Sequence, residues 1–87
     1  MHAVVIDVTF TDFEGAKAEL DELVPRVSSA PGFVAGYWIA LSEEKGTSVV
    51  VFDSESSAKM FLGTMQGAPP MSVTIDSVEV GEVIADA

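Results

Sequence analysis

Two adjacent strand-like segments in the middle of the chain constrain the fold more than any other feature. A Pro-Gly turn at residues 31–32 leads into an uncharged, aromatic run that ends near Ser42. The Glu-Glu-Lys-Gly segment at 43–46 then reverses the chain, and a β-branched run over 47–53 returns and continues into a serine-rich stretch. This arrangement predicts a β-hairpin followed directly by a helix.

The N-terminal part of the chain predicts a strand and then a helix. Over residues 2–10 the even positions are mostly apolar and form the face of a strand that we expect to pack in the core. Thr11 begins an S/T-x-x-E capping box, which predicts that a helix begins there. Apolar residues recur at helical spacing over 13–27, and Pro25 predicts a kink or a restart in the final turns.

The C-terminal part predicts a second helix and a last strand. The helix begins near residues 53–54, where Asp and Ser are both good N-cap residues, and Gly67 supplies a stop. Residues 71–84 predict the strand. Its apolar positions are odd up to Ile75 and even afterwards, which predicts either a β-bulge or a change of packing partner near residues 76–77.

The predicted order is strand, helix, strand, strand, helix, strand, in a single domain over residues 1–87. Two helices separated by strands in this way pack on one face of a four-stranded antiparallel sheet, which is the α+β, ferredoxin-like β-α-β-β-α-β arrangement. The expected strand order is 4-1-3-2, so the first and third strands should be central.

Composition limits the partners. Four basic residues stand against fourteen acidic ones, and the net charge of −10 would repel a phosphate backbone, so no nucleic acid partner is expected. No apolar run approaches the roughly 20 residues that cross a bilayer, so no membrane partner is expected. The chain has no cysteine and no nucleotide-binding or hydrolase motif. We therefore expect a cytoplasmic protein that uses no cofactor.

Apolar residues on both faces of the predicted strands indicate a homodimer. Val4 and Val5 are adjacent, as are Val49 and Val50, so each pair points to both faces of the sheet, whereas two helices cover only one face. Residues 27–42 contain no charge, although most of them would form an edge strand. A second copy of the chain is the expected cover for that edge and for the second face.

Two segments carry a resemblance to a known group of proteins. The Ala-Pro-Gly-Phe-Val-Ala-Gly-Tyr-Trp run at 30–38 and the Val-Val-Phe-Asp-Ser-Glu-Ser-Ser-Ala run at 50–58, in this strand order, resemble the dimeric α/β-barrel superfamily, in particular the antibiotic-biosynthesis-monooxygenase-like domains. The resemblance implies a homodimer whose two sheets form a barrel, with a small apolar pocket between each sheet and its helices. Members include cofactor-free oxygenases, haem-degrading enzymes, isomerases and domains without known activity, so the fold alone does not select a reaction.

The functional residues of this superfamily are not all present. Its oxygenases and haem degraders typically place an Asn near a Trp, with a His added for haem ligation. This chain has no Asn, and its single His is His2, at the start of the first strand. Haem degradation is therefore not expected, and a lone His at a strand end is usually solvated.

The candidate ligand-binding residues are Tyr37, Trp38, Phe61 and Met65. Tyr37 and Trp38 are adjacent on a strand, so one faces the helices and the other faces away. Trp can stack on a planar ring and Tyr can donate to an oxygen, but both also serve as packing mass. Phe61 and Met65, with Met71, are expected on the helix side of the pocket, where plain core packing is the alternative.

Asp7 is the candidate catalytic base. It lies between Val5 and Thr9 on the strand face turned away from the helices, where a dimer would desolvate it and raise its pKa. Asp76, on the neighbouring strand, could approach it. The alternative is a wet face or an interfacial hydrogen bond to a Thr or Ser.

Two functions remain open at this point. The first is a domain that binds a small hydrophobic or aromatic metabolite and that acts, if it is an enzyme, as a cofactor-independent monooxygenase or isomerase, with Trp38 or Tyr37 positioning the substrate and Asp7 removing a proton. The second is a non-catalytic dimeric ligand-binding or assembly module, in which the pocket is filled core. An effector-sensing domain is a third alternative, but such domains are usually fused to a DNA-binding segment.

The acidic residues at 43–44 and in the tail lack metal-ligand spacing, so no metal site is expected.

Overall fold

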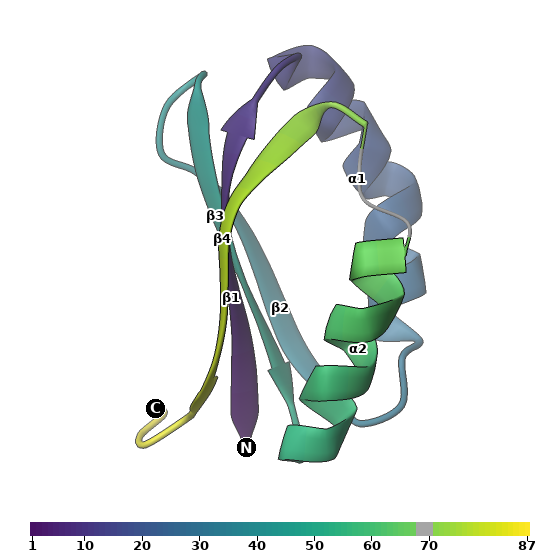
Figure 1. Cartoon of the computed structure of the whole chain (residues 1–87), viewed down its shortest axis with the longest axis vertical. Helices are drawn as coiled ribbons and strands as arrows, with labels where there is room; N and C mark the ends of the chain where they lie inside the picture. The colour runs from purple at the N-terminus through teal and green to yellow at the C-terminus, as the bar shows by residue number, and fades with distance from the viewer. Residues whose placement is uncertain (68–70) are drawn as a thin grey trace.

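The computed structural model describes residues 1–67 and 71–87 and contains six elements in the predicted order (Figure 1). The elements are β1 (His2–Phe10), α1 (Phe13–Ser28), β2 (Phe33–Ala40), β3 (Lys45–Phe52), α2 (Glu55–Gly67) and β4 (Val73–Glu82). The four strands form one antiparallel sheet in the order β2-β3-β1-β4, so the predicted central position of β1 and β3 is confirmed.

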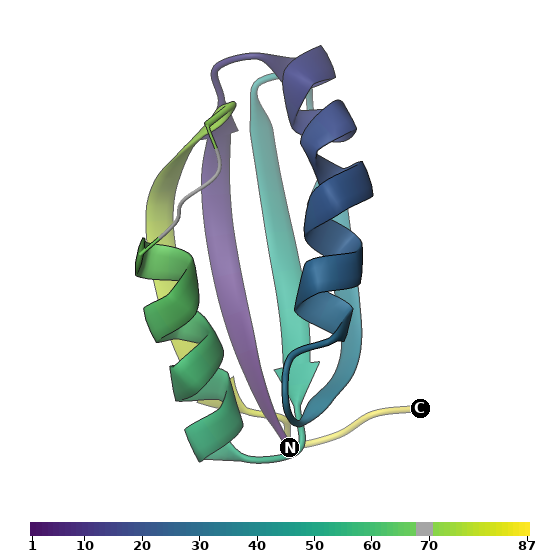
Figure 2. The ribbon, with the colours of Figure 1, turned by 90° about the vertical axis from the view of Figure 1, so that its right-hand side faces the viewer.

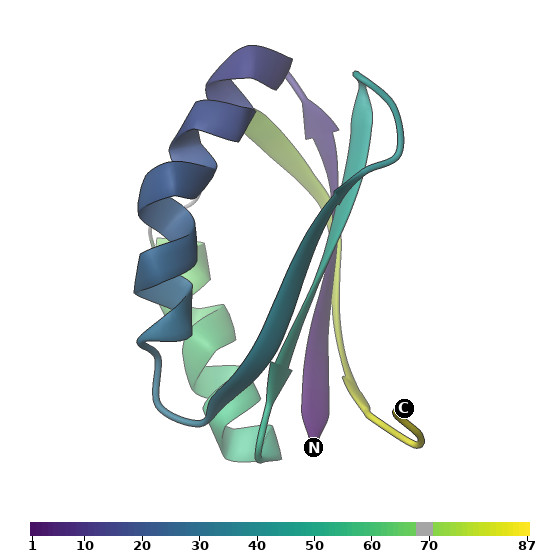
Figure 3. The same ribbon diagram turned by 180° about the vertical axis from the view of Figure 1, so that it is seen from behind.

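The two helices lie side by side over the same face of the sheet (Figure 2). Figure 3, the view opposite to that of Figure 1, shows the sheet nearly edge-on with both helices on the same side of it. We call the uncovered side the bare face; it carries the odd-numbered residues of β1 and β3, such as Val5 and Val49. Within the described residues, no helix is long and apolar enough to cross a membrane.

The core lies between the sheet and the helices. It is built from the even-numbered residues of the central strands, among which Val4, Val50 and Phe52 are fully buried. Val4 and Val50 are register partners across β1 and β3, and Val27 of α1 and Ala58 of α2 pack on the same cluster. The alternation seen in the sequence therefore selects the face on which both helices pack.

Strand β4 contains the predicted bulge. Asp7 of β1 pairs with Ser77, whereas the next residue, Val8, pairs with Ile75, so Asp76 is an extra residue in β4. The extra residue shifts the alternation by one position and lets the apolar residues on both sides of it face the core. The strand itself is shorter at both ends than the predicted 71–84.

Helix α1 begins at Phe13 because Asp12, and not Thr11, is its N-cap. Asp12 has an extended backbone, with φ −148° and ψ 99°, and its Oδ1 accepts a hydrogen bond from the Gly15 amide at 3.1 Å. The backbone amides of Thr11 and Asp12 both donate to the carbonyl oxygen of Ser72, at 3.0 and 3.3 Å. The predicted capping box is therefore wrong, because the side chain of Asp12, and not that of Thr11, caps the helix.

Helix α1 runs through Pro25 to Ser28 without a restart. The hydroxyls of Ser28 and Ser29 both donate to the Pro25 carbonyl oxygen, at 3.0 and 2.8 Å, and these bonds support the final turn. Helix α2 begins after Ser54, as predicted, and the Ser54 hydroxyl accepts from the Ser57 amide at 3.2 Å.

The two candidate caps of α1 can be distinguished by mutation. Asp12→Ala should lower the free energy of unfolding by about 0.5–2 kcal/mol, because it removes the acceptor of the Gly15 amide. Thr11→Ala is the matched control and should cost less, since its backbone bond to Ser72 is retained. Urea denaturation followed by circular dichroism measures both variants. A larger loss for Thr11→Ala would restore the capping box.

Candidate functional site

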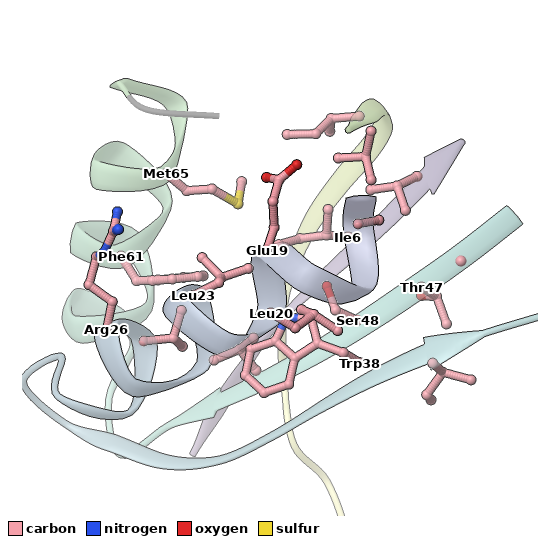
Figure 4. Close-up of a pocket in the computed structure, with 18 of the residues that line it drawn as sticks. Ile6, Glu19, Leu20, Leu23, Arg26, Trp38, Thr47, Ser48, Phe61 and Met65 are labelled. Atoms are coloured by element: carbon pink, nitrogen blue, oxygen red, sulfur yellow. The ribbon is translucent and has the colours of Figure 1, made fainter. Parts of the chain in front are cut away.

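A cavity of about 480 Å³ lies between the sheet and the two helices (Figure 4). The helix-facing residues of the sheet form its floor, and α1 and α2 form its opposite wall. Most of its lining is apolar and includes Ile6, Leu20, Leu23, Trp38, Phe61 and Met65. Concave apolar spaces of this size are typical of sites that bind small molecules.

Small residues help to keep this space open. Ala16 of α1 is buried and lines the cavity, where a longer side chain would occupy part of the volume. Gly46 of β3 also lines it, and a Cβ built there would lie 2.5 Å from the ring of Phe10. The sequence therefore places little side-chain mass at two points of the wall.

Two hydrogen-bonding side chains lie on the apolar floor. Trp38 of β2 and Ser48 of β3 are register partners, and both line the cavity. Ser48 is only 8% exposed, and neither its hydroxyl nor the Trp38 indole N–H has a hydrogen-bond partner among the residues that the structure describes. Neither atom is sealed in the protein interior without a partner, so both are accessible and can donate to an acceptor held in the cavity.

Three of the four predicted ligand-binding residues meet in this cavity. Trp38, Phe61 and Met65 line it. Tyr37 points the other way, as expected for the neighbour of Trp38, and is 61% exposed on the bare face. Met71 was expected beside Phe61 and Met65, but it lies ahead of β4 and is 92% exposed, so that prediction is wrong.

Asp7 lies on the bare face and not in the cavity. Its Oδ2 accepts a hydrogen bond from the Ser77 hydroxyl at 2.9 Å, which is the kind of contact that the non-catalytic alternative predicted. Asp76 accepts a hydrogen bond from the Thr9 hydroxyl at 2.6 Å and forms an ion pair with Lys45 at 3.4 Å. The Thr9 hydrogen bond, with the Lys45 charge, holds the pKa of Asp76 below its ordinary value. The two carboxylates therefore have separate partners.

His2 is also remote from the cavity. Its Nε2 lies 3.5 Å from the Glu55 carboxylate at the start of α2. Its Nδ1 is buried without a hydrogen-bond partner in the described part of the chain. The Lys59 hydrogen bond and charge, followed by the His2 charge, hold the pKa of Glu55 below its ordinary value. His2 therefore belongs to a contact between β1 and α2.

The cavity does not offer the ligands that haem or another metal centre requires. Its lining contains no His, Cys or Tyr within the described residues, and its two Met residues, Met60 and Met65, lack the His that accompanies a Met on haem iron. Over residues 1–67 and 71–87, no group of three His, Cys, Asp or Glu could hold a metal ion. The residues present do not fit haem.

Sequence reasoning missed several polar residues of the lining, among them Ser48, Lys17, Glu19 and Arg26. Ser48 could have been found, because its even position in β3 places it on the core-facing side. Lys17, Glu19 and Arg26 also line the cavity, although their spacing assigned them to the wet side of α1. Both carboxylate oxygens of Glu19 accept backbone amides of residues 71–72, at 3.2 and 2.9 Å, and so tie the start of the last strand to α1.

Comparisons with known proteins give similarities in structure only. No family model matches the sequence, and no curated protein sequence matches it. A dimeric ferredoxin-like protein from an uncultured marine organism is 16% identical, with a TM-score of 0.68, and the match covers 100% of this chain and 98% of that one. The chain has the ferredoxin-like fold.

Two further matches have described activities. A variant of SnoaB, a cofactor-independent oxygenase from Streptomyces nogalater, is 14% identical, with a TM-score of 0.66 over 98% of this chain and 95% of the other. The heme-degrader MhuD from Mycobacterium tuberculosis, solved with two hemes in its active site, is 22% identical, with a TM-score of 0.58 over 98% of both chains. The ferredoxin-like fold and the resemblance to monooxygenase-like domains are thus confirmed at the level of the fold.

Proposed function

We propose that this protein is a homodimer that binds a small, planar, mostly apolar metabolite between its sheet and its helices. The observation that carries the proposal is the cavity of about 480 Å³ with Trp38 and Ser48 on its floor. Its apolar walls would enclose the body of the ligand. The indole N–H and the Ser48 hydroxyl would donate to a carbonyl or hydroxyl oxygen and fix its orientation.

The bare face supports the homodimer. Val5, Val49 and Tyr37 are register partners in three consecutive strands, so they form an apolar stripe across the sheet. Ile39, next to Tyr37 on the same face of β2, is also exposed. The face of a sheet that is exposed to water normally carries polar residues. A second copy of the chain, packed on the bare face, would remove this apolar stripe from water.

Ligand binding without catalysis is the form of the proposal that the cavity favours. Glu19 is the one carboxylate of the described lining, and both of its oxygens already hold the amides of residues 71–72. Such a group is a poor general base, because a base needs a free lone pair within reach of the substrate.

Cofactor-independent oxygenation, or isomerisation, is the second candidate. It is favoured by the similarity in fold to SnoaB, which is described as a cofactor-independent oxygenase. Because Asp7 lies on the bare face, it would act only on a molecule held between the two sheets of the dimer. The roles of Asp7 and Tyr37 in such a site stay predictions from the sequence.

Binding in the cavity can be followed at a single signal. The chain has one Trp, so an amide-correlation NMR spectrum contains one indole peak, that of Trp38. Naphthamide, a neutral planar probe with a carbonyl acceptor, should shift this peak. Ala16→Leu should weaken binding on the order of tenfold by filling the cavity, a change of about 1.4 kcal/mol. Ala18→Leu, on the exposed side of the same helix, is the control and should bind as the wild type does.

An unshifted indole peak, or equal affinity of a folded Ala16→Leu variant, would contradict binding in this cavity. The thermal midpoint of each variant shows whether it is folded.

The dimer can be tested at the centre of the apolar stripe. Sedimentation velocity of the wild type should give a dimer. Val49→Lys should give a folded monomer, because it would bury a charge at the centre of the apolar stripe. Met71→Lys makes the same kind of change at an exposed site outside the bare face and should remain dimeric. A monomeric wild type, or a dimeric Val49→Lys variant, would refute this interface.

A further inference from the structure

Arg26 differs from the other basic residues of this acidic chain. The chain has four Lys and Arg residues against fourteen Asp and Glu residues. Lys17, Lys45 and Lys59 each lie within 3.4 Å of a carboxylate oxygen. Arg26 has no ion-pair partner among the described residues. In a chain with this excess of acid, a cation without a carboxylate beside it requires a reason.

The position of Arg26 supplies a reason. It lies in the last turn of α1 and lines the cavity. In Figure 4 its side chain stands among the lining residues and extends toward the α2 side of the view. The residue is exposed overall, so the charge keeps its hydration while the side chain borders an apolar space.

The other charged residues of the lining are already engaged. Lys17 pairs with Glu14 at 3.2 Å. Glu19 accepts the two amides of residues 71–72. Within the part of the chain that the structure describes, Arg26 is thus the charged group of the lining that is left to meet a ligand.

We propose that the natural ligand is an anion, namely an aromatic or otherwise apolar monocarboxylate whose body fills the cavity and whose carboxylate binds Arg26. This inference rests on the proposed function and names its ligand class. A guanidinium presents two parallel N–H donors that match the two oxygens of a carboxylate. The net charge of −10 opposes the binding of any anion, so the attraction has to come from a nearby cation, and one cation balances one negative charge. A doubly charged phosphate ester would need a second free cation, which the described lining does not have.

A pair of probes with the same ring separates charge from shape. Naphthoate and naphthamide differ in the carboxylate, and both can be titrated against the Trp38 indole peak at neutral pH. The wild type should bind naphthoate about fivefold more tightly, the size expected of an ion pair at an exposed site. Arg26→Gln should remove this preference, so that it binds naphthoate and naphthamide with equal affinity. Arg26→Lys should keep part of it, because it keeps the charge but not the paired donors.

Lys59→Gln is the matched control, because Lys59 is a basic residue of α2 that does not line the cavity. The Lys59→Gln variant should prefer naphthoate to the same degree as the wild type. Equal affinities of the two probes in the wild type, or an undiminished preference in Arg26→Gln, would overturn the anion inference and leave the proposed cavity function standing. Failure of both probes to bind would overturn both.

Discussion

The sheet of this protein carries apolar side chains on both faces, and its two helices cover only one of them. On the covered face Val4, Val50 and Phe52 are fully buried against α1 and α2. On the bare face Val5, Val49 and Tyr37 continue across three strands, and neither helix covers them. The hydrophobic effect acts on both faces alike, so the covered face accounts for the fold and the bare face accounts for the proposed dimer.

The candidate functional groups are divided between the two faces of the sheet. Trp38, Ser48 and the aliphatic lining belong to the helix side, whereas Tyr37 and Asp7 belong to the bare face. A ligand in the cavity of one chain therefore meets an indole N–H, a hydroxyl and the Arg26 guanidinium, but no free carboxylate of the described lining. This set of groups can orient and hold an apolar anion, whereas proton abstraction would require a second site between the sheets.

Much of the fold follows from local patterns. Alternation defines β1 to the residue, His2–Phe10, and the change of parity after Ile75 predicts the bulge at Asp76. These features can be read locally because successive side chains along a strand point to alternate faces of the sheet. The cap of α1 could not be chosen locally, since Thr11 and Asp12 are both capping types and the backbone amides of both are bound by Ser72, about sixty positions further along the chain.

The site was harder to predict than the fold. Phe61 and Met65 were expected on the helix side of the pocket, whereas the sequence did not decide which of Tyr37 and Trp38 faces the helices; Phe61, Met65 and Trp38 line the cavity. Arg26 was assigned to the solvated side of its helix, because a helical wheel cannot show how closely a second helix approaches. Likewise, the partner of Asp7 depends on the β1-β4 register, which places Ser77 and not Asp76 opposite it.

Native mass spectrometry of the protein, purified directly from the cells that make it, tests the central claim most directly because one spectrum reports subunit number and retained small molecules. The account predicts a dimer of 9.1 kDa chains that carries an organic acid, released when the complex is activated. A stable monomer would contradict it, because the bare face would then remain in water without a partner.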